Sequence, residues 1–132
     1  MAEPGVYLLD SEGLSQFALG HREMGARLRE ADRTGIRVAT TSMTLIEAYH
    51  GRIKKAAWTW TLSRVVVEPI TREIADSAIT LLGHAGLHGH KYTIGAALAS
   101  VALRQRGNVT IFTSDVEDMK MLCGDRVAIR GI

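Results

Sequence analysis

Short apolar runs alternate with helical patterns along the whole chain, and this alternation constrains the fold more than any other feature. Strands are expected at residues 5–9, 36–41, 65–69, 109–112 and 127–129. Strands that alternate with helices form a parallel sheet covered on both faces, joined by right-handed crossovers. The sequence therefore predicts the α/β class, as a three-layer α/β/α sandwich with a mainly parallel central sheet.

Helical periodicity fills the segments between these strands. Helices are expected at residues 15–33 with a break at Gly20, 43–50, 52–62, 71–82, 93–106 and 116–122. The intervening residues 83–91 are rich in glycine and histidine, a composition typical of a loop.

Length and composition narrow the class of protein. The 132 residues, 46% of them hydrophobic, suit one globular domain over residues 1–132. The weakly polar run at 94–103 is far shorter than the ~20 residues of a membrane span, and no leader pattern opens the chain. The single cysteine, Cys123, fits a cytoplasmic location, and a net charge of +2 does not by itself indicate a nucleic-acid partner.

Four acids follow predicted strands. Asp10 ends the first strand, Asp115 and Asp118 follow the 109–112 strand, and Glu47 lies in the helix after the 36–41 strand. Because sites of parallel sheets lie at the carboxyl ends of the strands, we expect these carboxylates to converge. A divalent cation relieves their repulsion, and oxygen ligands favour Mg²⁺ or Mn²⁺.

Helix capping is the alternative explanation for the same acids. Asp10 and Asp115 stand where N-cap residues belong, and residues 44–47 and 114–117 both fit the capping-box pattern. One acid at such a position is more often a cap than a ligand. Four acids on separate strand ends of one sheet favour a metal site.

Three segments carry a family resemblance. Each of them is an apolar segment with its acids, and they are residues 6–10, 41–47 and 109–119. They resemble the corresponding segments of PIN-domain ribonucleases, specifically VapC-type toxins of bacterial type II toxin–antitoxin pairs. The resemblance implies an endoribonuclease toxin that depends on Mg²⁺ or Mn²⁺, cleaves RNA and binds a cognate antitoxin.

The resemblance also implies residue roles. Asp10, Asp115 and Asp118 would be metal ligands, and Glu47 a ligand or the group that orients the attacking water. The metal lowers the pKa of that water and neutralises charge on the phosphodiester. Thr113 would hold a metal-bound water through its hydroxyl, although a buried strand threonine is the commoner role. His90 and Lys91 would contact a substrate phosphate.

One position departs from the family pattern. The third family segment begins with a metal-binding aspartate, and Gly95 stands in that place, followed by the matching Ala96, Leu98 and Ala99. No carboxylate occurs in residues 90–94. Three explanations remain open: a disabling substitution, which we favour, a natural non-cleaving relative, or a site with weak residual activity. The sequence therefore predicts an impaired nuclease, and the alternative is a non-catalytic PIN-fold module that binds antitoxin or RNA.

Two further clusters have open interpretations. Basic residues flank Trp58 and Trp60 and would hold RNA, or they form a solvated face around tryptophans that contact the core, the antitoxin or a second copy of the chain in a homodimer. The cations concerned are Arg52, Lys54, Lys55 and Arg64. The histidines of residues 83–90 would bind a transition metal or, the reading we favour, line a polar loop.

Overall fold

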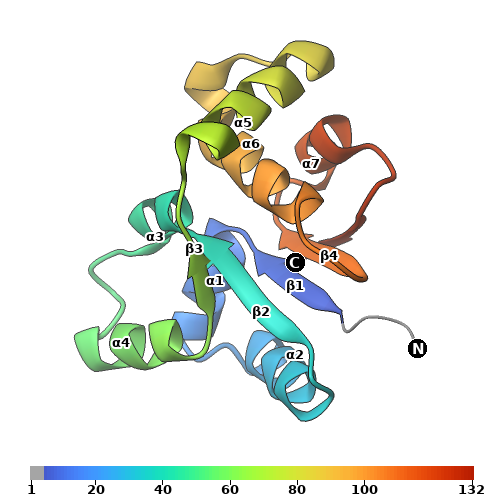
Figure 1. Cartoon of the computed structure of the whole chain (residues 1–132). Coiled ribbons are helices and arrows are strands. Elements are labelled where there is room, and N and C mark those ends of the chain that lie inside the picture. The colour runs from blue at the N-terminus through green and yellow to red at the C-terminus, as the bar shows by residue number, and fades with distance from the viewer. Residues whose placement is uncertain (1–4) are drawn as a thin grey trace.

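A five-stranded, all-parallel sheet forms the centre of the molecule (Figure 1), in a computed structural model that describes residues 5–132. Its order is β3-β2-β1-β4-β5. The strands are β1 (Val6–Leu9), β2 (Arg37–Thr41), β3 (Val66–Glu68), β4 (Val109–Thr113) and β5 (Ala128–Gly131). The predicted α/β/α sandwich with a parallel sheet is confirmed.

Helices cover both faces of this sheet (Figure 1). On one side lie α1 (Ser11–Ala18), α2 (Arg22–Arg33) and α4 (Lys55–Ser63). On the other lie α5 (Arg72–Ala85), α6 (Gly89–Leu103) and α7 (Val116–Cys123). The short α3 (Ser42–Ala48) follows β2 directly, so it stands at the carboxyl edge of the sheet.

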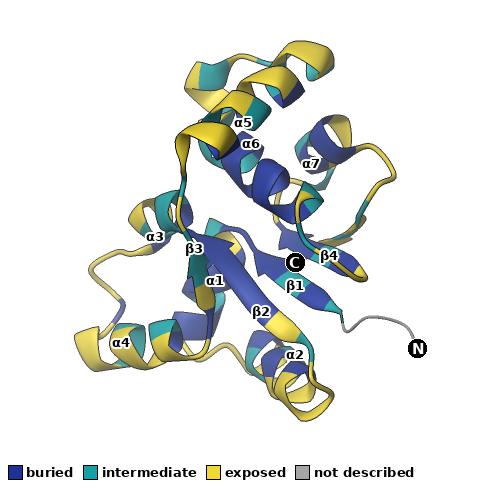
Figure 2. Cartoon of the chain, viewed as in Figure 1, coloured by how far each residue is buried: buried dark blue, intermediate teal, exposed yellow. Residues whose placement is uncertain are grey.

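Alternation along the strands produces two cores, one on each face. Leu8 and Ile111 pack with α5, α6 and α7, whereas their neighbours Leu9 and Phe112 pack with α1 and α2. All four side chains are fully buried, and the central strands are correspondingly dark in Figure 2. Burial on both faces explains why these strands read as continuous apolar runs in the sequence.

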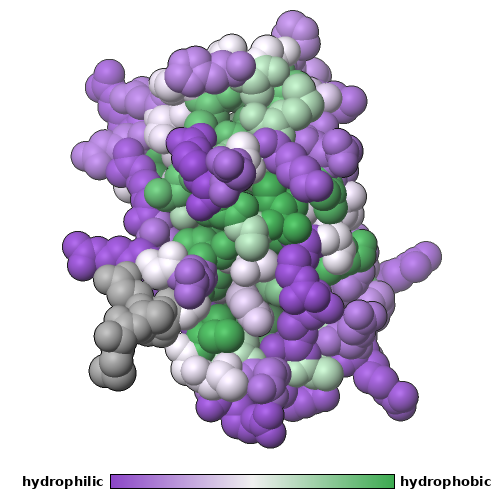
Figure 3. Space-filling model, turned by 90° about the vertical axis from the view of Figure 1, so that its right-hand side faces the viewer, coloured by the Kyte–Doolittle hydropathy of each residue, from purple (hydrophilic) through white to green (hydrophobic). Residues whose placement is uncertain are grey.

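The edge of the sheet at β5 is less well covered. Most residues of β5 are exposed, although Ile129 packs against the α6 side of the core. Viewed from the side of α7 and β4, hydrophobic residues gather in the middle of the surface, with hydrophilic residues around them (Figure 3). Within residues 5–132, no helix has the length and apolar character needed to cross a membrane.

The winding of the chain creates a crevice between β1 and β4. From β1 the chain adds β2 and β3 on one side, and it then returns to add β4 and β5 on the other. Ligand sites of open α/β sheets lie where the order reverses, beyond the carboxyl ends of the strands. Asp10, which follows β1, and Asp115, which follows Thr113 of β4, both lie at this switch point.

Two predicted helix boundaries are wrong. The expected helix at 15–33 is two helices, and the first begins at Ser11 because Asp10 caps it; the break at Gly20, with φ +77°, is confirmed. The expected loop at 83–91 is mostly helical, since α5 continues to Ala85 and α6 begins at Gly89. Only one glycine in that stretch, Gly86 with φ +67°, uses the left-handed conformation that ends a helix.

Candidate active site

A cavity of about 310 Å³ opens at the switch point. It is lined by residues from α1, α3, α6, α7 and the ends of β1 and β4. The residues singled out from the sequence all line it: Asp10, Glu47, His90, Lys91, Gly95, Thr113, Asp115 and Asp118. The expected convergence of distant acids on one pocket is therefore what the structure shows, while their chemical roles stay predictions.

Asp10 is the most firmly held of the four acids. One carboxylate oxygen accepts from the backbone N–H of Gly13 at 2.9 Å, and the other accepts from the N–H of Ser114 at 2.9 Å. Asp10 thus caps α1, and it also links the end of β1 to the loop after β4 by a hydrogen bond. The sequence had given these two roles as alternatives, and the structure shows that a carboxylate with two oxygens can serve a cap and face a cavity together.

Burial raises the pKa of Asp10 above its ordinary value of 3.8. The two backbone N–H donors and the nearby Thr113 hydroxyl act in the opposite direction, and the negative charge of Asp115 adds to the rise. Desolvation is the largest of these causes because only 9% of Asp10 is exposed. A cation in the cavity would offset part of that cost.

Thr113 is fully buried at the end of β4, and its hydroxyl accepts from the backbone N–H of Asp115 at 2.9 Å. Asp115 occupies the N-cap position of α7, but its side chain makes no capping hydrogen bond. The capping explanation is therefore wrong for Asp115, and its carboxylate is exposed beside the cavity. Sequence reasoning missed the backbone of Ser114, which carries no side-chain signal for its contact with Asp10.

The capping-box explanation for Glu47 is also wrong. The N-cap of α3 is Thr41, whose hydroxyl accepts from the N–H of Thr44 at 3.1 Å. Glu47 lies in the last turn of this seven-residue helix, too far along it to reach the helix start. Its exposed side chain lines the cavity instead.

The wall formed by α6 carries no carboxylate. A Cβ built on Gly95 would lie 3.9 Å from Leu122 Cδ1 and 4.0 Å from Met119 Cε, which is ordinary van der Waals contact. Neither its backbone conformation nor its neighbours require a glycine at this position. A side chain placed at residue 95 would enter the cavity that Gly95 lines.

The acids around the cavity do not make a complete metal site. Within residues 5–132, no three His, Cys, Asp or Glu side chains are grouped closely enough to hold a metal ion. Asp10, Asp115 and Asp118 share the cavity, and their predicted role as ligands remains a prediction. The residues present do not fit a tightly bound divalent cation.

The tryptophans of α4 lie on different sides of the helix, as their spacing predicts. Trp58 packs against Tyr49 with ring centroids 5.2 Å apart, and Trp60 packs against Phe17 at 5.4 Å. Trp60 is half exposed and borders a second cavity of about 530 Å³. Its lining includes Phe17, Leu28, Arg29, Val38, Trp60, Arg64 and Val66. Of these residues, the sequence had singled out Trp60 and Arg64.

Comparisons with known proteins give a likeness in fold but no match to a family model or a curated sequence. No family model matches the sequence, and no curated protein matches it. Eleven chains of solved structures match the fold. One belongs to the crystal structure of VapBC2 from Rickettsia felis bound to a DNA fragment from their promoter, with a TM-score of 0.68 and 16% sequence identity, covering 96% of this chain and 98% of that chain.

The likeness to this solved structure concerns the fold. The five-stranded parallel sheet with helices on both faces is a PIN-type α/β/α architecture. The chain has, more particularly, a VapC-like fold, since the likeness to the VapBC2 structure extends over nearly the whole of both chains.

Proposed function

We propose that this protein is the toxin of a type II toxin–antitoxin pair, a VapC-like endoribonuclease whose active site is impaired at position 95. One observation carries the proposal: four carboxylates from three separate parts of the fold line a single cavity at the switch point, and its α6 wall has a glycine with room for a side chain. In this view Gly95 replaces a metal-binding aspartate.

Hydrogen bonds within this chain still hold the strand side of the proposed site in place. Gly13 and Ser114 hold the Asp10 carboxylate in place, and Thr113 holds the backbone of Asp115. At the mouth of the cavity, His90 and Lys91 are exposed and suited to a substrate phosphate. The completed site would hold Mg²⁺ or Mn²⁺, the ions that favour carboxylate oxygens. With the present residues the metal set is incomplete, so RNA cleavage is expected to be low or absent.

Gly95→Asp tests this proposal. Expressed with and without the cognate antitoxin, the variant is expected to arrest growth without antitoxin and to cleave RNA in the presence of Mn²⁺. Gly95→Asn, which has the same shape without the charge, is the matched control and should do neither. The combination of Gly95→Asp with Asp10→Asn should again be inactive. Robust Mg²⁺-dependent cleavage by the unmodified chain, abolished by Asp10→Asn, would show that the site is not impaired.

A non-catalytic binding module is the second candidate. The second cavity favours it, because an apolar floor bordered by Trp60, Arg29 and Arg64 suits a partner segment with apolar and acidic residues. The VapBC2 structure is that of a toxin–antitoxin complex, which supports an antitoxin as partner. If Gly95→Asp changes neither growth nor RNA integrity, the binding module is the better description. If Gly95→Asp is toxic, Trp60→Ala in that background should weaken protection by the antitoxin.

The proposal extends to assembly and location. A homodimer is part of the proposal, and Ile79 on α5, an apolar side chain that is 66% exposed, is one position at which to test it. Light scattering of the purified protein and of Ile79→Asp tests this, since the substitution should convert dimer to monomer. A cytoplasmic location, where both RNA and antitoxin are found, is part of the same proposal, and a fluorescent fusion would check it.

A further inference from the structure

We propose that the loop between α3 and α4, residues 49–54, together with Lys55 and Trp58 of α4, forms a binding surface for single-stranded RNA next to the candidate active site. We call it the 49–58 surface. The inference rests on the proposed function, because it names the form of RNA that reaches the cavity. Three observations carry it: an exposed tyrosine ring packed against the partly buried Trp58, cations without acidic partners, and a short hydrogen-bonded link to the cavity wall.

The aromatic pair gives the surface a place for bases. Tyr49 is 45% exposed, and its ring meets that of Trp58 edge to face, with an interplanar angle of 68°. The contact with Trp58 fixes the Tyr49 ring without covering it. Unpaired bases stack on such rings, whereas the bases of a duplex are already stacked on one another. An exposed, immobilised ring therefore favours single strands.

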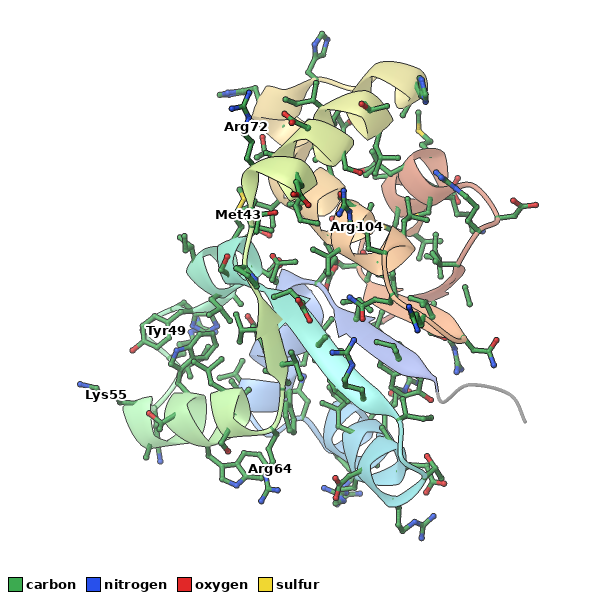
Figure 4. All side chains as sticks on the ribbon, viewed as in Figure 1. Met43, Tyr49, Lys55, Arg64, Arg72 and Arg104 are labelled. Carbon is green, nitrogen blue, oxygen red and sulfur yellow. The ribbon has the colours of Figure 1, made fainter. Side chains whose placement is uncertain are left out.

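Three exposed cations lie in the same segment of the chain as this pair. Arg52, Lys54 and Lys55 are exposed, and the chain has no acidic residue between Glu47 and Glu68. Over residues 5–132, salt bridges hold five other arginines but none of these three cations. Their charges are therefore available to phosphates. Figure 4 shows Tyr49 and Lys55 on the same side of the molecule, near the loop that joins α3 to α4.

The loop is anchored at both ends. The Ala48 carbonyl, at the end of α3, accepts from the Ser15 hydroxyl at 2.6 Å, and the buried Ile53 donates its N–H to the His50 carbonyl at 3.0 Å. Glu47, two residues before Tyr49, lines the cavity. The 49–58 surface therefore begins two residues after the cavity wall along the chain.

Electrostatics explains why such a surface is needed. The cavity is lined by four carboxylates but by only one lysine and one histidine, so it repels a phosphate chain. A strand held by cations outside the cavity is brought close despite that repulsion, and its phosphate contacts supply affinity through counterion release. The surface therefore positions RNA, while the cavity carries the chemistry of the proposed function.

Binding of a fluorescent oligouridine to the full chain in EDTA tests the inference without any cleavage. Lys54→Gln with Lys55→Gln should weaken binding on the order of tenfold and reduce the salt slope by about 1.4, given roughly 0.7 per phosphate contact on a single strand. Tyr49→Ala should weaken binding about tenfold, and Tyr49→Phe should retain it, because stacking needs the ring and not the hydroxyl.

Arg104→Gln with Arg106→Gln is the matched control, since it removes the same charge at the far end of α6, where Figure 4 labels Arg104. This pair should leave binding unchanged. Equal losses in the two pairs, no loss in the lysine pair, or tighter binding to an RNA duplex would each overturn the inference. Failure is separable from that of the nuclease proposal: RNA binding by this surface without cleavage in Gly95→Asp leaves the inference intact, whereas cleavage by Gly95→Asp with an unaltered KM in the lysine pair refutes it.

Discussion

The two walls of the candidate active site differ in how completely they are built. On the strand side, Asp10 is tied by two backbone N–H groups, and Thr113 fixes the backbone of Asp115. On the α6 side, residues 90–95 provide a histidine, a lysine and a glycine in place of any carboxylate. One wall is organised to hold anionic groups in position, and the other offers open space.

This difference distinguishes the residues that stabilise the fold from a position that only the proposed chemistry would use. The hydrogen bonds of Asp10 and Thr113 join β1, α1 and β4, so changes there alter stability as well as function. Position 95 makes no comparable contact, and a Cβ there meets only two side-chain carbons at 3.9–4.0 Å. A substitution at 95 can therefore change the cavity and leave the fold intact, which is what the proposed function requires of this position.

The largest expected effect is restoration of metal binding on the α6 wall. Gly95→Asp should make thermal stability depend on Mn²⁺, with a gain of about 2.7 kcal/mol at a hundredfold excess over the dissociation constant. Differential scanning calorimetry with and without Mn²⁺ measures this gain.

Gly95→Ala separates metal binding from helix propensity. It should stabilise the protein by about 0.5–1 kcal/mol, because alanine is the better helix former, with no dependence on Mn²⁺. If Gly95→Asp and Gly95→Ala respond identically to Mn²⁺, the proposed completion of the site is wrong and the two walls do not form one metal centre.

A pair of threonines probes the strand wall against the α6 wall. Thr113→Val removes the acceptor for the Asp115 N–H in a fully buried position and should cost about 1–3 kcal/mol. Thr93→Val, on the exposed start of α6, should change stability by no more than about 0.5 kcal/mol. Urea denaturation of both variants gives the comparison. Similar losses would mean that the walls are equally important for folding.

The sequence predicted the layered fold because burial on both faces leaves a strong apolar signal in the strands. It failed at 83–91, where glycine and histidine indicated a loop. Only Gly86 needs a left-handed conformation, and α5 and α6 pack against each other and leave only residues 86–88 of this stretch outside a helix. Local composition could not reveal that tertiary contacts extend both helices.

For the site, the sequence predicted convergence but not the hydrogen bonds. The position of an acid after a strand fixes the edge of the sheet where it lies, so Asp10 and Asp115 could be placed together. Whether each also caps a helix depends on backbone geometry, and the two acids differ in this respect. Contacts between separate elements produce the exposed ring of Tyr49 and the second cavity beside Trp60. A local sequence pattern contains no information about such contacts.

A buried hydroxyl without a partner sharpens the contrast with Thr113. Thr61 on α4 is fully buried, and its hydroxyl is the one buried side-chain polar atom within residues 5–132 that has no hydrogen-bond partner. Thr61→Val should therefore stabilise the protein, by about 1 kcal/mol, since it removes an unpaired polar group and keeps the shape. Urea denaturation should show opposite signs for Thr61→Val and Thr113→Val. A loss in both would mean that the Thr61 hydroxyl is paired in solution.

The smallest expected effect is the pH dependence of the strand wall. Because burial raises the pKa of Asp10 in the folded state above its ordinary value of 3.8, the folded protein binds this proton more tightly than the unfolded chain. The stability contributed by Asp10 is therefore fully present below pH 3.8 and is lost as pH rises through the folded-state pKa. Measured in EDTA, the stability of Asp10→Asn minus that of the unmodified protein should become more positive over this rise. The altered hydrogen bonds of asparagine add only a constant offset to this difference in stability. A stability difference that stays flat or falls as pH rises would contradict the burial of the Asp10 carboxylate in the strand wall.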